Sequence, residues 1–297
     1  MRMLSTLVLV LATATGCATA SKGSAALGQA LLPTSEEVKL GNQLAAQVNQ
    51  EEKILNNDTV QRYVDQVGQR VAKVAPDKRK GIRYQFTVVD DPRQVNAFAL
   101  PGGHMYVYSG LIAAAGSEAE LASVLAHEVG HVNARHAAQS LGAQFGLQTL
   151  ASLALGQNPG QIQQLGAAIA AQGYLMRNSR DMEREADERG LDYLRRAGYD
   201  TSAMPAFFRR LEKLAGSNPS FIQAFFASHP APGERATTLS KEIQRKRLSG
   251  GKKEIVGSFS SIQSQLGSSK SGTTKPKTDG GSTRPKSDGG SRPPAPR

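Results

Sequence analysis

The chain has 297 residues, of which 39% are hydrophobic, so it is long enough for one sizeable domain, and its formal net charge is +11. That charge lies at the end of the chain: residues 241–297 hold 13 Lys and Arg against 4 Asp and Glu, whereas the preceding 240 residues hold 23 against 21. A nearly neutral domain argues against a nucleic-acid partner, and a single cysteine excludes both an intrachain disulfide and a cysteine zinc cluster.

The first 17 residues are typical of a bacterial lipoprotein signal. Arg2 precedes an apolar run that is too short to span a bilayer, which needs about 20 residues, and small residues lead to Cys17. Residues 14–17 predict lipidation of Cys17, while an A-x-A site at 18–20 is the alternative and would release a soluble protein. We therefore expect an exported protein, with a lipid anchor in the outer membrane and the domain in the periplasm favoured over a soluble form.

A small, polar tether at 18–34 leads to a domain predicted for residues 35–248. Ser35 and Asp58 are suitable N-caps for two helices. Each helix has a row of apolar residues on one face, namely Leu40, Leu44 and Val48 in the first and Val60, Val64, Val67 and Val71 in the second.

Three short strands should follow these helices. Apolar and polar residues alternate in 83–88, and two further apolar segments, at 97–100 and 104–108, are separated by the turn residues 101–103. We expect the three strands to pair as a small antiparallel sheet.

The second half of the domain is predicted to be helical. Ser117 and Glu120 form a capping box at the start of a helix that should run through about His136. Residues 141–155 and 162–176 predict a helical hairpin or lid, and residues 181–196 form a charged helix that ends before Gly198. The predicted fold class is α+β, mainly helical, with the small sheet beside the capped helix.

The tail at 249–297 is predicted to be disordered, because Ser, Gly, Lys and Pro dominate it and it cannot bury apolar surface. It contains a tandem nine-residue repeat at 274–282 and 283–291. The tail is interpreted as a solvated spacer, with electrostatic contact to an anionic polymer or membrane surface as the alternative.

The segment His127-Glu128-Val129-Gly130-His131 carries the main chemical signal. Two histidines four residues apart on a helix face the same side, so both can bind one zinc ion. Glu128 lies next to them and can remove a proton from water that the metal has acidified. The segment that precedes His127 is apolar, which favours a buried metal site over two solvated histidines.

A catalytic zinc ion needs a third protein ligand, and the charged helix offers Glu183, Glu185 and Glu188. Glu183 and Asp187 share one helix face, which favours Glu183 as the ligand and Asp187 as a supporting acid that bonds an imidazole. Spacing alone leaves Glu185 open. His104 and His136 are expected to be structural.

With these motifs in place, the chain resembles the HExxH zinc endopeptidases that include the CAAX-prenyl proteases, the membrane heat-shock protease and the periplasmic β-barrel assembly-enhancing proteases. The resemblance covers roughly residues 35–245 and rests on the segments 96–103, 127–136 and 179–187. It implies a zincin-like domain with one Zn²⁺ per chain, with Glu183 as third ligand and Asp187 as supporting acid.

The resemblance also implies further site residues. His229, in a His-Pro segment, is a candidate for a fourth, displaceable ligand or for stabilising the oxyanion. Apart from the resemblance, Arg180 is a candidate for a supporting ion pair. An edge strand that pairs with extended substrate is implied for His104, Met105, Tyr106, Val107 and Tyr108.

The leading hypothesis is therefore an envelope zinc endopeptidase whose partners are extended or misfolded polypeptides. One alternative is a non-catalytic or latched chaperone-like assembly factor with bound zinc, against which the presence of Glu128 argues. Another is a polymer-binding tether in which the basic tail does the main work.

Overall fold

The computed structural model describes residues 32–146, 152, 160, 164–165, 178–229 and 232–268. Cys17 with the rest of the predicted signal, most of the predicted lid and the tandem repeats lie outside these ranges. None of the helices within them meets the length and hydropathy that a membrane-spanning segment requires.

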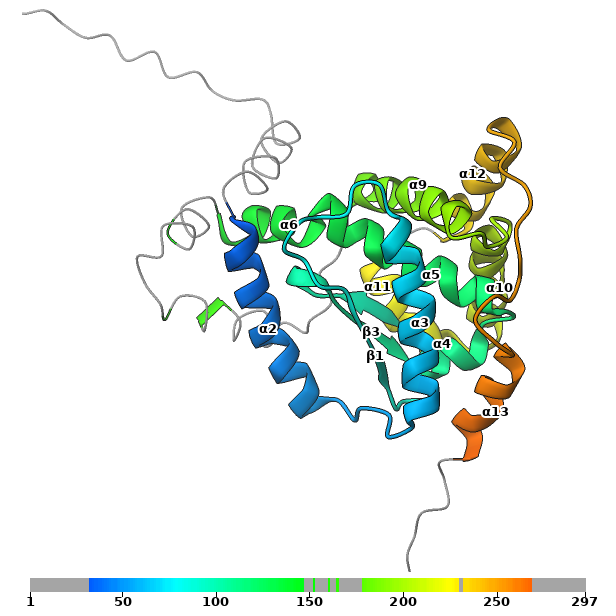
Figure 1. Cartoon of the computed structure of the whole chain (residues 1–297), viewed down its shortest axis with the longest axis horizontal. Helices are drawn as coiled ribbons and strands as arrows, with labels where there is room; N and C mark the ends of the chain where they lie inside the picture. The colour runs from blue at the N-terminus through cyan, green and yellow to red at the C-terminus, as the bar shows by residue number, and fades with distance from the viewer. Residues whose placement is uncertain are drawn as a thin grey trace, which may run out of the picture.

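The domain has the predicted α+β class and is mainly helical, with a three-stranded sheet at its centre (Figure 1). The helices are α2 (Thr34–Glu51), α3 (Asp58–Val74), α4 (Ser109–Ala114), α5 (Glu118–Ala134), α6 (His136–Phe145), α9 (Arg180–Arg196), α10 (Ala203–Ser217), α11 (Pro219–Ser228), α12 (Pro232–Arg245) and α13 (Phe259–Ser268). The strands are β1 (Gln85–Val89), β2 (Ala97–Ala99) and β3 (His104–Tyr108), and a 3-10 turn, η1 (Pro101–Gly103), joins the last two.

The sheet is mixed, so the predicted antiparallel pairing is only half right. The strand order is β1-β3-β2, in which β3 pairs antiparallel with β2 and parallel with β1. The connection at 90–96 is too long for a tight hairpin, and its Val95 N–H donates to the carbonyl of Phe221 in α11. Strand β2 is thus not adjacent to β1, and the tight turn η1 brings β3 back between the two.

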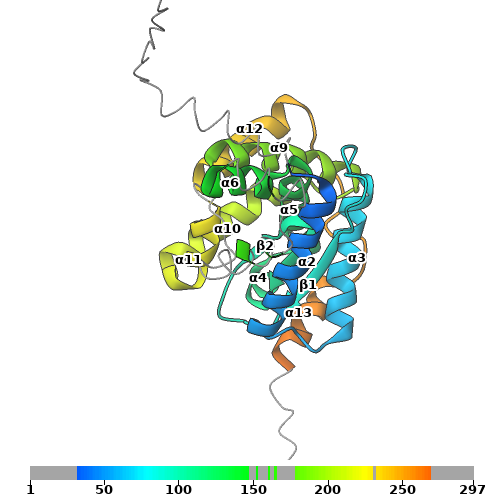
Figure 2. The same ribbon diagram turned by 90° about the vertical axis from the view of Figure 1, so that its left-hand side faces the viewer.

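Both faces of the sheet are covered by helices. Met105 and Val107 of β3 belong to the main apolar cluster, to which α3 and α5 contribute. Tyr106 and Tyr108 point to the opposite face and belong to a second cluster, to which α2 contributes. In the turned view, α10 and α11 lie on the side of the domain opposite α3 (Figure 2).

The helix starts differ from the predicted N-caps by one or two residues. Asn57, and not Asp58, caps α3, because its side-chain oxygen accepts from the N–H groups of Thr59 at 3.1 Å and Val60 at 3.2 Å. The helix α2 begins at Thr34 after Pro33, without a side-chain cap. The predicted apolar rows of both helices are buried.

The capping box at the start of α5 is confirmed in part. The Ser117 hydroxyl accepts from the Glu120 N–H at 3.2 Å, as predicted. The Glu120 carboxylate accepts from the N–H of Gly116 at 2.7 Å, one residue before the N-cap, and also pairs with Arg210.

Close approach of α5 and α9 depends on two glycines. A Cβ at Gly130 would lie 2.9 Å from the Ala186 carbonyl oxygen, and one at Gly190 would lie 3.0 Å from the His127 backbone nitrogen. Only glycine permits this spacing, which brings the charged helix directly against the His127–His131 segment.

The helix α5 ends at Ala134, two residues before its predicted end. Arg135 adopts a left-handed conformation with φ 60°, and α6 begins at His136. Ion pairing with the buried Glu37 at 3.1 Å and a hydrogen bond to the Leu32 carbonyl hold Arg135 there.

The predicted boundary at residue 249 is wrong, because the chain stays folded to at least residue 268. Phe259 and Ile262 of α13 are buried in the main apolar cluster. The backbone N–H groups of residues 255–257 donate to the buried carboxylate of Glu118 at 3.0–3.3 Å. The composition of this segment led to a wrong prediction because a few apolar residues are enough to fold a segment when they pack against an existing domain.

Candidate metal centre

Helix α5 positions three polar side chains of the His127–His131 segment inside the protein. All 17 residues of α5 are buried, including His127, Glu128 and His131. The spacing of four brings the two imidazoles together, with their Nε2 atoms 2.9 Å apart.

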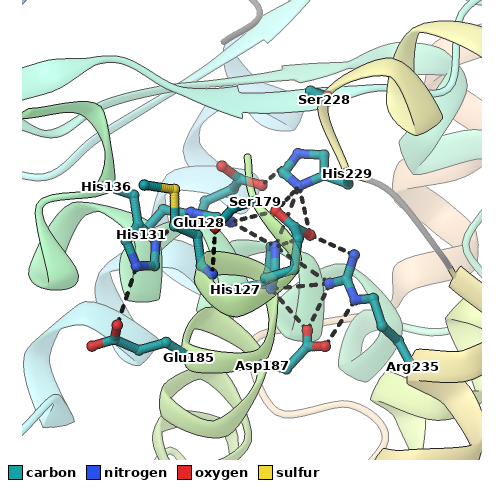
Figure 3. Close-up of polar contacts among 12 residues, drawn as sticks. His127, Glu128, His131, His136, Ser179, Glu185, Asp187, Ser228, His229 and Arg235 are labelled. Carbon is teal, nitrogen blue, oxygen red and sulfur yellow. Dashed lines mark hydrogen bonds and ion pairs between the residues drawn. The ribbon is translucent and has the colours of Figure 1, made fainter. Parts of the chain in front are cut away.

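Helix α9 adds a carboxylate to these rings. The Glu183 oxygens lie 3.2 Å from His131 Nε2 and 3.5 Å from His127 Nε2. His229, directly after α11, brings Nδ1 to 3.2 Å from both Glu183 oxygens. One ligand atom from each of these four residues lies within 4.8 Å of every other. Figure 3 shows the three histidines close together.

This donor set fits a zinc ion. Two imidazoles and one carboxylate, with a further position beside them, are typical of catalytic Zn²⁺ sites. Moreover, Glu128 Oε1 and His229 Nε2 are buried and lack a hydrogen-bond partner in the described part of the chain. Buried polar atoms without a hydrogen bond are rare in proteins unless an ion, a water molecule or a substrate interacts with them.

The local charges prepare the site for a cation. Burial alone would raise the pKa of Glu183, but the charge of His229 and hydrogen bonds from His127 and His131 hold that pKa far below its usual range. Burial and the charge of His127 lower the pKa of His131. The carboxylate is therefore anionic and the His131 ring neutral, which are the states in which they bind a metal.

His127 is the ring that must release a proton. Burial and Arg235 lower its pKa, but the contacts with Asp187 and Glu183 outweigh them and raise it to about 9. A cation that replaces this proton balances the negative charges of Asp187 and Glu183 in its place.

Asp187 and Arg235 contact the ligand residues and fix their orientation. Asp187 Oδ1 lies 3.0 Å from His127 Nδ1, on the side of the ring away from Glu183. Arg235 Nη1 lies 2.6 Å from Glu183, and Arg235 Nη2 lies 2.6 Å from Asp187. The guanidinium also lies over the ring of Phe208, 4.2 Å from its centre.

Sequence reasoning missed Arg235. It is the last residue of the segment 228–235 that carries the His-Pro resemblance, but nothing in its immediate neighbourhood distinguishes it from Arg245, the exposed arginine of the same helix. Only its burial and its contacts with two acids from α9 reveal its place.

Several candidate residues lie elsewhere. Glu188 is exposed, and Glu185 contacts His136 instead of the donor cluster. Arg180 is 74% exposed and pairs with Glu234, which is also exposed, at 3.6 Å. His104 contacts Asn42 at 2.8 Å.

The implied edge strand is also wrong. Residues His104, Met105, Tyr106, Val107 and Tyr108 form β3, which is the middle strand and pairs on both sides. The outer strand on the side of the metal centre is β2, since Phe98 and Ala99 line one cleft together with Glu128, His131 and His229. The motif at 96–103 was recognised in the sequence, but its pairing depends on the order of the strands.

Comparisons with known proteins agree with this geometry. The sequence profile of peptidase family M48 matches residues 58–243. A "Putative beta-barrel assembly-enhancing protease" of Vibrio cholerae is 35% identical over 219 residues, which are 69% of this chain and 44% of that protein. The metalloprotease YcaL of Escherichia coli K12 is 30% identical over 241 residues, 78% of this chain and 87% of that protein.

A third relative comes from a different compartment. The mitochondrial metalloendopeptidase OMA1 of Arabidopsis thaliana is 32% identical over 195 residues, which are 65% of this chain and 38% of that protein. The chain thus spans less than half the length of the β-barrel assembly-enhancing relative and of OMA1, and most of the length of YcaL.

Proposed function

This chain belongs to peptidase family M48, and from that premise we propose that it is a zinc-dependent endopeptidase of the bacterial cell envelope. Its substrates are extended or misfolded polypeptides. The observation that carries the proposal is the buried group of His127, His131 and Glu183, beside which Oε1 of Glu128 has no hydrogen bond from the described residues and lies 3.5 Å from His229 Nε2.

In this proposal His127, His131 and Glu183 hold one Zn²⁺. A bound zinc ion supplies Lewis acidity, which polarises a peptide carbonyl and brings the pKa of water down to about 7. Asp187 accepts from His127 Nδ1 and keeps Nε2 of that ring free of a proton. Arg235 joins Asp187 and Glu183 and so fixes both carboxylates in place.

Glu128 is proposed as the general base. It comes from the same helix as both ligand histidines and lines the cleft, and its Oε1 has no hydrogen bond from the described residues. Glu128 takes a proton from the attacking water and delivers it to the nitrogen of the departing amine. A carboxylate that had only a structural role would not require an open oxygen.

Substrate binding is proposed at the outer edge of β2. The bonds from Leu100 N–H to His104 and from Tyr108 N–H to Asn96 direct the even-numbered residues of this segment towards β3. The backbone groups of Ala97 and Ala99 therefore point away from β3, on the side of the cleft. An extended chain can pair there through its backbone, which suits substrates of varied sequence.

Ala99→Pro tests this binding mode. The substitution removes an outward N–H while it leaves the bonds between β2 and β3 in place. We expect a lower kcat/KM on casein with an unchanged zinc content. Unchanged kcat/KM in a variant with wild-type thermal unfolding would contradict pairing along this edge.

Location in the envelope is proposed from the lipoprotein-type signal, with Cys17 as the lipidated residue. The names of the β-barrel assembly-enhancing relatives are consistent with an envelope protein. Incorporation of labelled palmitate tests the anchor, and Cys17→Ser should move the protein from the membrane fraction to the soluble fraction. If Cys17→Ser fractionated like the wild type, a lipid anchor at Cys17 would be excluded.

A second candidate function is a latched assembly factor, and His229 favours it. Its Nδ1 lies 3.4 Å from His127 Nε2, within the donor cluster, and its Nε2 lies 3.5 Å from Glu128 Oε1. A displaceable fourth ligand at this place would hold the enzyme inactive, whereas an oxyanion-stabilising His229 would promote hydrolysis. His229→Ala separates the two, because casein turnover rises if His229 is a latch and falls if it stabilises the oxyanion.

The central test is metal analysis of the purified mature protein combined with casein hydrolysis. We expect about one zinc per chain, loss of activity with a strong chelator, and recovery when Zn²⁺ is returned. Protein that is folded, cleaves casein and contains no stoichiometric metal would overturn the proposal.

A further inference from the structure

His136 is a buried histidine beside the metal centre that the proposed hydrolysis does not use. It is the first residue of α6 and is 2% exposed. Its Nδ1 lies 2.7 Å from Nδ1 of His131, and its Nε2 lies 3.4 Å from Oε2 of Glu185 (Figure 3). The side chain thus connects a ligand histidine to a carboxylate of α9.

The direction of these hydrogen bonds follows from the role of His131. Its Nε2 is the atom that faces the donor cluster, 3.2 Å from Glu183 and 2.9 Å from His127. An imidazole nitrogen must be free of hydrogen to bind a metal, so the proton of His131 belongs on Nδ1. That N–H donates to Nδ1 of His136, which in turn carries its proton on Nε2, towards Glu185.

We propose that His136 and Glu185 form a hydrogen-bonded relay that sets the tautomer and the orientation of His131, so that His136 is a positioning residue of the metal centre. The inference rests on the proposed function, since it presumes that His131 binds zinc. His136 thereby has a role beyond the structural one that was expected from the sequence. Glu185 bonds the imidazole of His136 and does not bind the metal.

The break between α5 and α6 is what brings His136 to this place. In one continuous helix, a residue five positions after His131 would be turned by about 140° from it, at 100° per residue. The left-handed conformation of Arg135 redirects the chain, so that His136 returns to the His131 ring. A non-glycine residue in this conformation is strained and persists only where its surroundings enforce it, as Glu37 does here.

The two ligand histidines therefore have different supports, although both supports come from α9. Asp187 reaches His127 directly and is itself buried. Glu185, two residues earlier, is 44% exposed and reaches His131 only through His136. Arg189 fixes Glu185 at 2.6 Å.

Zinc affinity is the measurement that tests the relay. Full-length protein is titrated with Zn²⁺ in competition with a chromogenic chelator, and the ligand-field absorption of the Co²⁺ form is recorded. His136→Leu removes the acceptor for the His131 N–H, so we expect zinc affinity to fall about 10–100-fold and the Co²⁺ spectrum to change. His136→Asn places an amide oxygen near the position of Nδ1 and should retain most of the affinity.

The order of these two variants separates positioning from packing. Leucine fills the buried space at least as well as asparagine, so a merely structural His136 predicts that His136→Leu binds zinc as well as His136→Asn or better. Gln139→Leu is the control on the same helix, since its amide bonds the Ala134 carbonyl and it should leave affinity unchanged. Melting of the apo forms shows whether each variant is folded.

Glu185 provides a second test that does not disturb the core. Glu185→Ala should weaken zinc binding by a smaller factor than His136→Leu, whereas Glu188→Ala, an exposed carboxylate of the same helix, should not. Equal affinity of wild type, His136→Leu and Glu185→Ala would overturn the relay and leave the proposed function standing. A wild-type protein that binds no zinc would instead remove the proposed function.

Discussion

Helix α5 carries Glu118 at its start and Glu128 at the metal centre, two buried carboxylates whose hydrogen bonding differs. Glu118, its first residue, is 0% exposed and accepts from the hydroxyls of Tyr63 at 2.6 Å and Tyr199 at 2.7 Å. It also accepts from three backbone N–H groups at 255–257. Glu128 is 2% exposed, yet its Oε1 has no hydrogen bond from the described residues.

This difference in hydrogen bonding separates Glu118, an acid that stabilises the fold, from Glu128, an acid that is free to take part in a reaction. Burial would raise the pKa of Glu118, but the hydrogen bonds from Tyr63, Tyr199 and the backbone lower it below its usual value. Such a fully bonded carboxylate cannot accept another proton without breaking its contacts. An unbonded buried oxygen costs about 1–3 kcal/mol, which a fold retains where a reaction uses that oxygen.

The same substitution, Glu to Gln, at each of these two positions gives the sharpest comparison. Glu128→Gln should reduce casein turnover about 10²–10⁴-fold, because the amide cannot remove a proton from water. Zinc content and thermal unfolding should match wild type, since no hydrogen bond to Oε1 is lost. Turnover within a few-fold of wild type would show that Glu128 is not the base.

Removal of the segment that bonds Glu118 should have the next largest effect. A chain ending at Leu248 loses the burial of Phe259 and Ile262 and three donors to Glu118, so the free energy of unfolding should fall by at least about 3 kcal/mol. A chain ending at Ser268 should unfold like the full-length protein. Denaturant titration of both truncations checks this, and equal stability of the two would place the domain end at 248.

Glu118→Gln should lower stability and spare the chemistry. The amide group turns one acceptor into a donor that faces other donors, at a cost of about 1–3 kcal/mol in the free energy of unfolding. The kcat of the folded fraction, measured well below the unfolding midpoint, should equal that of wild type. A loss of kcat without a loss of stability would reverse the roles assigned to the two acids.

The pH dependence of that stability difference is the smallest expected effect. The folded-state pKa of Glu118 is lowered, so its contribution is complete above the unfolded-state pKa of Glu, about 4.3, and is lost as the pH falls through the lower folded value. The difference in unfolding midpoint between wild type and Glu118→Gln should therefore be constant from pH 7 to 5 and shrink in stronger acid. A difference that grows as the pH falls would contradict the lowered pKa.

Local rules account for the parts of the centre that could be predicted. The spacing of His127 and His131, the Ser117 cap and the apolar rows of α2 and α3 depend on neighbours three or four residues apart, so they can be read from the sequence. The same holds for Gly198, whose positive φ of 84° follows α9 as predicted.

Tertiary packing decided the rest. Which acid of α9 meets the imidazoles depends on the close approach of two helices at Gly130 and Gly190, and spacing alone left both Glu183 and Glu185 open. The place of Arg235, the middle position of β3 and the folding of residues 249–268 depend likewise on segments far apart in the chain. Helical period and capping act within one turn, whereas the energy of a buried charge depends on every group that surrounds it in three dimensions.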